Sequence, residues 1–347
     1  MKLMKKKIFL AGGCGYIGSL LIRKLLDLGY IVKCLDLFIY GDSTVKSLSN
    51  NKNFILIKGD VREKKILEKH IEDSDIIIHL AAIVGDKPCE SAPKASYDIN
   101  FKGTKLLADI AREKKVKKFI FASTCSNYGI SDQNTFATET SELNPVSLYA
   151  ESKIDCENLL DKYAEDDFNV IALRFGTAYG VSYRTRFDLT VNSFAYEAYK
   201  TNKISVFAYD TWRPYIHVDD ICNIIIEMVK KENFKESSNT FNAGFTHENF
   251  TKKEVVEKLK KILPKLDVEY ITLSNDKRNY KVDFSKIDKF LNIKNSFNVS
   301  QGFQEILSAL QDKSISETNY LSNNLEALVK FFKSNKDKLE FNLNEKK

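Results

Sequence analysis

Three glycines between an apolar run and a helical pattern set the strongest limit on how this chain can fold. The segment reads AGGCGYIG, and Gly12, Gly15 and Gly18 in it have the spacing GxxGxxG. In a strand–turn–helix unit the first glycine permits a tight turn, the second lets a diphosphate approach the backbone, and the third lets the helix pack close to the strand. The backbone N–H groups that open the helix, here those of Tyr16 and Ile17, then face the phosphates. The segment therefore predicts a dinucleotide-binding turn.

Apolar, β-rich runs alternate with helical patterns over the first half of the chain. The runs are KKIFLAG, YIVKCLD, NFILIKGD, DIIIHLAA, KKFIFAST and NVIALRFG, and helical periodicity lies between them, as over 16–28 and 101–114. Near-continuous apolar strands separated by helices indicate a parallel sheet covered on both faces. The sequence therefore predicts an α/β protein: a doubly wound, parallel-sheet Rossmann domain with a smaller mixed α/β C-terminal substrate domain.

The pattern changes after residue 175, where loops, shorter strands and helices follow. We expect the Rossmann domain over 1–175, with 217–244 returning to it, and the substrate-binding subdomain over 176–216 and 245–347. Within the latter, TKKEVVEKLKKIL predicts a helix with Thr251 as its N-cap and Glu254 as its third residue.

Composition favours a soluble globular protein. The 347 residues are 43% hydrophobic and 29% charged, with a formal net charge of +6. The sequence has no dense basic stripe with interleaved aromatic residues and no apolar stretch as long as a bilayer is thick, so we expect neither a nucleic-acid partner nor a membrane. The six cysteines lack CxxC spacing, which predicts no metal site, no disulfide framework and a cytoplasmic protein.

A carboxylate ends the second apolar run. Asp36 lies 18 residues after Gly18. A carboxylate at this place accepts hydrogen bonds from the adenosine ribose and repels a 2′-phosphate, and no Arg follows within DLFIYGDS. The cofactor is therefore predicted to be NAD rather than NADP. In GDV, Asp60 and Val61 are candidate adenine contacts, with a plain turn as the alternative for Asp60.

Thr124, Tyr149 and Lys153 form the candidate catalytic set. Tyr149 and Lys153 are four residues apart, on one face of a helix, and Thr124 ends the fifth apolar run. This set suits proton removal from a sugar or alcohol hydroxyl while a hydride passes to a nicotinamide. A Lys ammonium and the positive nicotinamide favour the phenolate of a Tyr, whose usual pKa is about 10. Thr124 can hydrogen-bond the reacting oxygen. The alternative is a YxxxK pair on a helix surface, without a catalytic role.

These motifs together resemble the extended short-chain dehydrogenase/reductase family, the NAD-dependent nucleotide-sugar epimerases and dehydratases that are similar to UDP-glucose 4-epimerase. The resemblance covers most of the chain and includes GGCGYIG, HLAA, NFKGT, STCSNYG, YAESK, RFGTAYG, RPYIHVDD and FNAG. It implies that Tyr149 is the base, that Lys153 also binds the nicotinamide ribose, and that Thr124 fills the family's Ser/Thr position. The further cofactor-lining residues that it implies are Leu80, Ala81, Ala82 and Asn100.

The resemblance also implies a nucleotide-diphosphate sugar as substrate. Arg213 in WRPYIHVDD matches the Arg that reaches the diphosphate, although Pro214 replaces the family's usual Asp. Arg278 in DKRNYKVDFSKIDKF is a second diphosphate candidate. The alternative for each Arg is a solvated surface charge. The segment SYRTRFDLTVNSF adds the substrate-binding candidates Arg184, Arg186 and Asn192.

The end of the fifth run departs from one branch of the family. In the 4,6-dehydratases it reads Thr-Asp-Glu, and the Asp and Glu eliminate water. Here Cys125 and Ser126 stand at those places, so a dehydratase is not expected. Other branches have a catalytic Cys at the place of Ser126. Because Cys125 lies one residue earlier and would face the other side of a strand, it is interpreted as a buried small residue, with a catalytic role as the alternative.

The function predicted from the resemblance is an NAD-dependent nucleotide-sugar 4-epimerase that works through a 4-keto intermediate. The alternative is an NAD-dependent 4-dehydrogenase or 4-keto reductase acting on a GDP-, UDP- or TDP-hexose or heptose in polysaccharide biosynthesis. A non-catalytic NAD-binding protein is a third hypothesis, and the intact Thr124, Tyr149 and Lys153 argue against it. The resemblance further implies a homodimer, paired through the helix that carries Tyr149 and the preceding helix.

Overall fold

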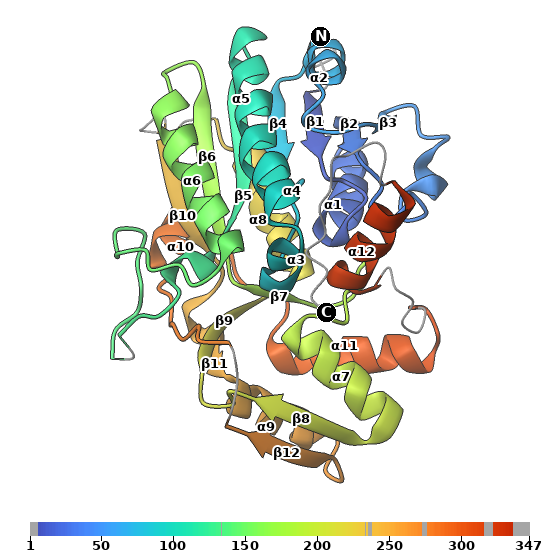
Figure 1. The fold of residues 1–347 in the computed structure, drawn as a ribbon, viewed down its shortest axis with the longest axis vertical. Helices are drawn as coiled ribbons and strands as arrows, with labels where there is room; N and C mark the ends of the chain where they lie inside the picture. The colour runs from blue at the N-terminus through green and yellow to red at the C-terminus, as the bar shows by residue number, and fades with distance from the viewer. Residues whose placement is uncertain are drawn as a thin grey trace.

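A seven-stranded parallel sheet forms the larger of two lobes (Figure 1). The computed structural model describes residues 6–132, 134–232, 234, 238–272, 276–315 and 322–335. The strands are β1 (Lys7–Ala11), β2 (Ile31–Asp36), β3 (Phe54–Lys58), β4 (Ile76–His79), β5 (Lys118–Thr124), β6 (Asn169–Phe175) and β10 (Ser238–Ala243). Their order is β10-β6-β5-β4-β1-β2-β3, with every neighbouring pair parallel. The order reverses at β1, which confirms the predicted doubly wound Rossmann architecture.

Helices cover both faces of this sheet, and Figure 1 shows α5 and α6 in front of it and α8 behind. One core packs the sheet against α1 (Tyr16–Asp27), α8 (Val218–Lys230) and α10 (Ser285–Leu291). The other packs it against α2 (Lys64–Ile71), α5 (Gly103–Glu113), α6 (Leu148–Tyr163) and α12 (Asn324–Ser334). In β1, Ile8 and Leu10 belong to the first core, and Phe9 and Ala11 to the second. Because successive side chains of a strand face opposite sides, both sets must be apolar, which explains the near-continuous apolar runs.

The smaller lobe lies below the sheet in Figure 1 and has its own core. Its strands are β7 (Thr177–Tyr179), β8 (Lys203–Phe207), β9 (Trp212–His217), β11 (Asn249–Thr251) and β12 (Asp267–Ile271), and its helices are α7 (Thr190–Thr201), α9 (Lys252–Ile262) and α11 (Val299–Gln311). Strands β11, β9 and β7 form one sheet, and β12 pairs with β8. Helix α9 begins with the predicted capping box, in which Thr251 accepts from the Glu254 N–H and Glu254 accepts from the Thr251 N–H.

Segments from late in the chain return to the larger lobe. Strand β10 extends the large sheet and α8 covers it. Helix α12 adds Leu328 and Phe332 to the core beneath α5 and α6, and α10 adds Ile287 to the opposite core. We therefore propose that α10 and α12 belong with the Rossmann domain, whereas the boundary drawn from the sequence assigns all of 245–347 to the substrate subdomain.

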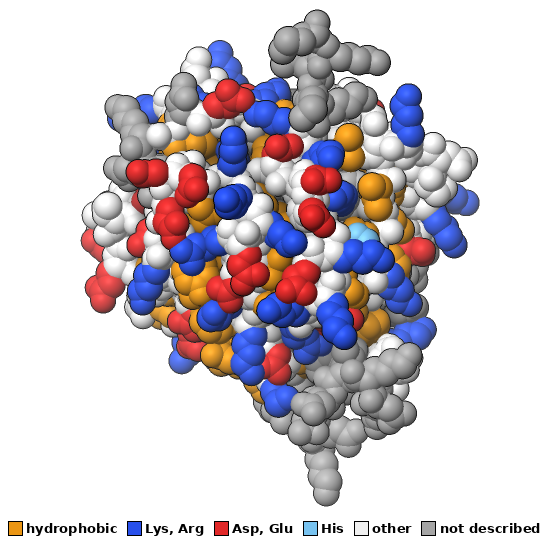
Figure 2. Space-filling view, turned by 90° about the horizontal axis from the view of Figure 1, so that it is seen from above, with side chains coloured by type: hydrophobic (Ala, Val, Ile, Leu, Met, Phe, Trp, Pro, Cys, Tyr) orange, Lys and Arg blue, Asp and Glu red, His pale blue; other side chains and the backbone are white. Residues whose placement is uncertain are grey.

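The end of the larger lobe that Figure 2 shows interleaves basic and acidic side chains. Ion pairs on two of its helices illustrate the pattern: Lys105 and Asp109 are 2.7 Å apart on α5, and Lys64 and Glu68 are 3.5 Å apart on α2. Such exposed pairs contribute at most about 1 kcal/mol each. Over the described ranges of the chain, the structure has no helix with the length and apolarity needed to span a bilayer.

Glu248 in the smaller lobe provides a test of the fold that depends on pH. Its side chain is buried, and its carboxylate accepts a hydrogen bond from the Val299 N–H at 3.2 Å, where α11 begins. Burial raises the pKa of Glu248 from 4.5 to about 7, although the Val299 N–H opposes the rise. Between these pH values the unfolded chain has released a proton that the folded protein retains. The free energy of unfolding should therefore fall as pH rises through this window.

We expect Glu248→Gln to remove this contribution while it keeps an acceptor for the Val299 N–H. Relative to the variant, the wild-type protein should lose on the order of 3 kcal/mol of unfolding free energy between pH 4.5 and pH 7. Urea unfolding of both proteins across this range measures the difference. A difference that stays constant with pH would contradict the assignment.

Candidate active site

A long cleft runs along the carboxyl ends of β1, β4 and β5 and reaches the smaller lobe. Most residues singled out in the sequence line it, and Asn100, Asn192 and Arg213 lie outside the lining. Those in the lining are Gly12, Gly15, Tyr16, Ile17, Gly18, Asp36, Asp60, Val61, Leu80, Ala81, Ala82, Thr124, Tyr149, Lys153, Arg184, Arg186 and Arg278.

The three glycines of the first turn meet three different surroundings. A Cβ on Gly12, whose φ is +89°, would lie 2.5 Å from the Ala81 nitrogen, and a Cβ on Gly18 would lie 2.6 Å from the Gly12 oxygen. A Cβ on Gly15 would meet only the Gly12 oxygen, at 3.7 Å. The space above Gly15 is therefore open, and no side chain caps the start of α1 there. A diphosphate fits this turn, because backbone N–H groups face open space.

Asp36 ends β2 and lies beside the glycine turn, which it contacts through Cys14. Its carboxylate accepts hydrogen bonds from the N–H groups of Cys14 and Phe38, both at 2.8 Å. Each oxygen keeps a lone pair for a hydroxyl in the cleft, which fits the ribose of an adenosine. Asp60 also reaches the cleft, but its carboxylate forms a bidentate pair with Arg62, whose Nη2 is 2.6 Å from Oδ2.

The candidate catalytic side chains come from β5 and from the first turns of α6. Ser147 caps α6 by accepting from the Ala150 N–H. Lys153 is buried, and its Nζ donates to the Ala122 carbonyl at 2.7 Å and lies 5.9 Å from the centre of the Tyr149 ring. Thr124 ends β5, and its Oγ1 accepts from the Ser126 N–H at 3.1 Å. The three side chains therefore line one part of the cleft.

Electrostatics in the protein chain alone do not produce a phenol of low pKa. Burial raises the pKa of Tyr149 above its usual range, and among the charged groups around it Arg186 lowers the pKa whereas Asp86 raises it. Burial also lowers the pKa of Lys153, to about 8. From the sequence, Lys153 and the oxidised nicotinamide were expected to lower the pKa of Tyr149. In the chain alone, the effect of burial on the pKa of Tyr149 outweighs the opposing effect of the Arg186 charge.

A buried polar network, which the sequence argument missed, joins the elements that carry the catalytic set. Glu157 of α6 pairs with Arg174 of β6, with Nη2 to Oε2 at 2.6 Å and Nε to both oxygens at 3.1 Å. Ser123 of β5 and Asn127 also donate to Glu157. The network fixes α6 against the end of β5, and so fixes Tyr149 against Thr124. The sequence signal for this network was Arg174, a charged residue inside the apolar run NVIALRFG.

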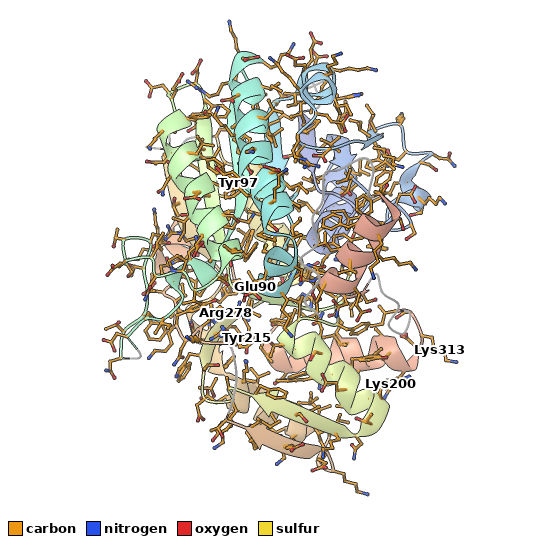
Figure 3. The ribbon with its side chains drawn as sticks, in the orientation of Figure 1. Glu90, Tyr97, Lys200, Tyr215, Arg278 and Lys313 are labelled. Atoms are coloured by element: carbon orange, nitrogen blue, oxygen red, sulfur yellow. The ribbon has the colours of Figure 1, made fainter. Side chains whose placement is uncertain are left out.

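At the other end of the cleft, Arg278 faces the space where the two lobes meet (Figure 3). Its guanidinium pairs with Asp276 at 2.8 and 3.0 Å, and with Asp86 of α3 (Asp86–Ser91) at 3.2 Å. Arg213 is buried behind it and donates to the Trp212 and Arg278 carbonyls and to Asp276. Arg278 is therefore placed to meet a ligand, whereas Arg213 holds the segment that carries Arg278.

Two asparagines that the sequence assigned to ligands form hydrogen bonds between their side-chain amides and backbone groups. Asn100 exchanges two hydrogen bonds with Ile83, at 2.8 and 3.0 Å, and so shapes the loop after β4. Asn192 accepts from the Gly180 N–H at 2.9 Å and donates to the Arg186 carbonyl at 2.8 Å. Both asparagines position loops whose other residues line the cleft.

The residues after β5 divide between the core and the cleft. Cys125 is fully buried, and its Sγ donates to the Arg174 carbonyl at 3.0 Å, so it lies in the core. Burial raises the pKa of this thiol well above its usual value. Ser126 lines the cleft, with its hydroxyl 3.4 Å from that of Tyr280. A hydroxyl and not a carboxyl therefore borders the cleft beside Thr124.

Comparisons with known proteins show which family this chain resembles. The model of the NAD dependent epimerase/dehydratase family matches residues 8–244. The chain is similar to UDP-glucose 4-epimerase of Lactobacillus helveticus, with 28% identity over 284 residues, 76% of this chain and 83% of that protein. It is similar to the crystal structure of dTDP-glucose 4,6-dehydratase from Bacillus anthracis in complex with NAD, with a TM-score of 0.78, 25% identity, and coverage of 89% of this chain and 97% of the other.

A second solved structure resembles the chain in fold. It is UDP-glucuronic acid 4-epimerase from Bacillus cereus in complex with UDP-glucuronic acid and NAD. The TM-score is 0.79 at 24% identity, and the likeness covers 88% of this chain and 99% of that one. The similarity extends over both lobes.

The glycine geometry generates a paired prediction. In Gly15→Ala the new methyl group meets open space at an ordinary φ of −80°, so the variant should keep its unfolding free energy. The methyl group fills the space left for a diphosphate, and NADH affinity should fall by ~10-fold or more. In Gly18→Ala the methyl group collides with the Gly12 carbonyl, and the unfolding free energy should fall by ~1–3 kcal/mol. Denaturant unfolding and NADH fluorescence titration separate the two effects. Equal stability losses in both variants would contradict this account.

Proposed function

Because the chain belongs to the NAD-dependent epimerase/dehydratase family, whose members are NAD-using enzymes that modify nucleotide sugars, we propose that it is a nucleotide-sugar 4-epimerase. The observation that carries this proposal is the composition of the cleft beside β5. Thr124, Tyr149 and Lys153 line it together, and the neighbouring Ser126 offers a hydroxyl where a dehydratase would need a carboxyl.

The cleft lining from the glycine turn to Asp36 would hold NAD, which would supply the acceptor and the donor of a hydride at C4 of the sugar. Tyr149 takes the proton of the C4 hydroxyl on its phenolic oxygen, and returns that proton when the hydroxyl is restored. Thr124 hydrogen-bonds the same sugar oxygen and keeps it beside the phenol. Lys153 is held by the Ala122 carbonyl, from which position its ammonium favours the phenolate.

The fate of the 4-keto sugar depends on what lies beyond these three side chains. Elimination of water requires an acid and a base next to Thr124. Cys125 is buried in the core, and Ser126 has neither the acidity nor the basicity of a carboxyl group. The keto sugar therefore keeps its oxygens, and return of the hydride to the opposite face inverts C4.

Arg278 is the residue that we assign to the sugar nucleotide. Its guanidinium lines the cleft between the lobes, where a diphosphate would meet it in bidentate fashion. The carboxylates of Asp276 and Asp86 hold it there at 2.8–3.2 Å. A diphosphate would thus exchange with carboxylates that already occupy the guanidinium, which suits reversible binding of a substrate.

The proposal is tested by supplying UDP-, GDP- and TDP-linked sugars and following reduced-nicotinamide absorbance together with product identity. The wild-type enzyme should give a C4-inverted product, with a reduced-nicotinamide signal that never exceeds the enzyme concentration. Tyr149→Phe should lower turnover by ~10²–10⁴-fold, because the general base is removed, while NADH still binds. Tyr163→Phe, which changes the same residue type at the far end of α6, is the matched control and should keep full activity.

Two outcomes would contradict the proposal. Accumulation of a keto sugar with a signal that grows as NAD is added would indicate a 4-dehydrogenase. Turnover by Tyr149→Phe equal to that of Tyr163→Phe would exclude Tyr149 as the base.

A further inference from the structure

The loop 180–189, which the sequence argument assigned to the substrate, is fastened to the cofactor-binding turn. The hydroxyl of Tyr16 donates to the Gly180 carbonyl at 2.8 Å. The Ser182 hydroxyl donates to the Tyr16 carbonyl at 2.5 Å and lies 3.2 Å from that of Ser19. The loop therefore crosses the first turn of α1, where the open space above Gly15 suits a diphosphate.

Arg184 of this loop lines the cleft beside Tyr40. Its guanidinium lies 3.5 Å from the centre of the Tyr40 ring and donates to the Asn324 side-chain oxygen at 2.7 Å. Asn324, the first residue of α12, also donates to the Val84 carbonyl at 3.1 Å. Burial lowers the pKa of Arg184 to about 10, and the charge of Asp36 acts on it in the opposite direction.

Arg186 lines the same cleft. It pairs with Asp188 through two contacts of 3.0 Å, and its side chain is 12% exposed. Burial raises the pKa of both Tyr16 and Tyr149, and the charge of Arg186 opposes that rise at each phenol. The guanidinium thus acts on both the diphosphate turn and the catalytic phenol.

We propose that Arg184 and Arg186 bind the diphosphate of NAD and not that of the sugar nucleotide. In this arrangement α12 fastens the loop 180–189 across the cofactor through Asn324, so that the cofactor stays bound from one turnover to the next. The contacts depend only on the use of NAD. Retention of NAD between turnovers rests on the proposed 4-epimerase function, because an epimerase restores its cofactor in each cycle and does not need to exchange it.

Charge balance supports this assignment. A cofactor diphosphate carries two negative charges, whereas the start of a helix offers the equivalent of about half a positive charge. The first turn of α1, Tyr16 to Ser19, contains no charged side chain. The facing loop carries Arg184, Arg186 and Asp188, a net charge of +1, and each guanidinium can form charge-assisted hydrogen bonds with phosphate oxygens.

The test compares Arg184→Gln and Arg186→Gln with Arg278→Gln, in full-length protein stripped of cofactor. The first two variants should bind ADP and NADH ~10–100-fold more weakly, because a charged contact to the diphosphate is lost. Their affinity for adenosine, which lacks the diphosphate, should change by less than ~3-fold. Arg278→Gln should bind ADP and NADH like the wild-type protein and should weaken binding of UDP, GDP or TDP. NADH fluorescence and calorimetry measure these affinities.

Because Arg186→Gln would also break the ion pair with Asp188, Arg184→Gln is the primary variant. A second test leaves both arginines in place. Asn324→Ala removes the fastening at α12, and NADH should dissociate ~10-fold faster from it. Unchanged ADP and NADH binding in Arg184→Gln, with weakened binding of UDP, GDP or TDP, would overturn the proposal and return Arg184 to the substrate. Because none of these probes carries the hexose or heptose of a sugar nucleotide, the result is independent of the reaction that the enzyme catalyses.

Discussion

The site depends on the close approach of two chain segments at the carboxyl edge of the sheet. Strands β1 and β4 are neighbours that end at this edge, and the chain leaves them toward opposite sides. The turn after β1 comes so near the loop after β4 that a Cβ on Gly12 would lie 2.5 Å from the Ala81 nitrogen. Only a residue without a side chain permits this contact at a φ of +89°. The crevice between the two turns, and with it the start of α1, follows from this approach.

Local spacing in the sequence was enough to predict the parts of the site that one strand–turn–helix unit builds. The glycine turn and Asp36 belong to such units, and so do Tyr149 and Lys153 on one helical face. The capping box of α9 was predictable for the same reason, because its two partners lie three residues apart. Each of these features depends on backbone geometry over a few residues.

Features that depend on packing between distant segments could not be predicted. Arg184 and Asn324 are 140 residues apart, and no pattern in the tail indicates that α12 reaches the cleft. The resemblance implied that Arg213 binds the substrate diphosphate, but backbone carbonyls and Asp276 accept from its guanidinium. The pKa of Tyr149 depends in the same way on how much of the phenol the folded chain buries.

In the arrangement that we propose, one cleft holds two diphosphate ligands, and each ligand meets arginines that other side chains hold in place. Arg278 is held by the carboxylates of Asp276 and Asp86, which compete with any phosphate that approaches. Arg184 contacts the Tyr40 ring and the Asn324 side-chain oxygen, and the charge of Asp188, which pairs with Arg186, also acts on it. Competing carboxylates reduce the net gain from binding an anion, and they are present at both ends of the cleft. The feature that distinguishes the proposed cofactor end is therefore the loop 180–189, which hydrogen bonds from Tyr16 and to Asn324 fasten across it.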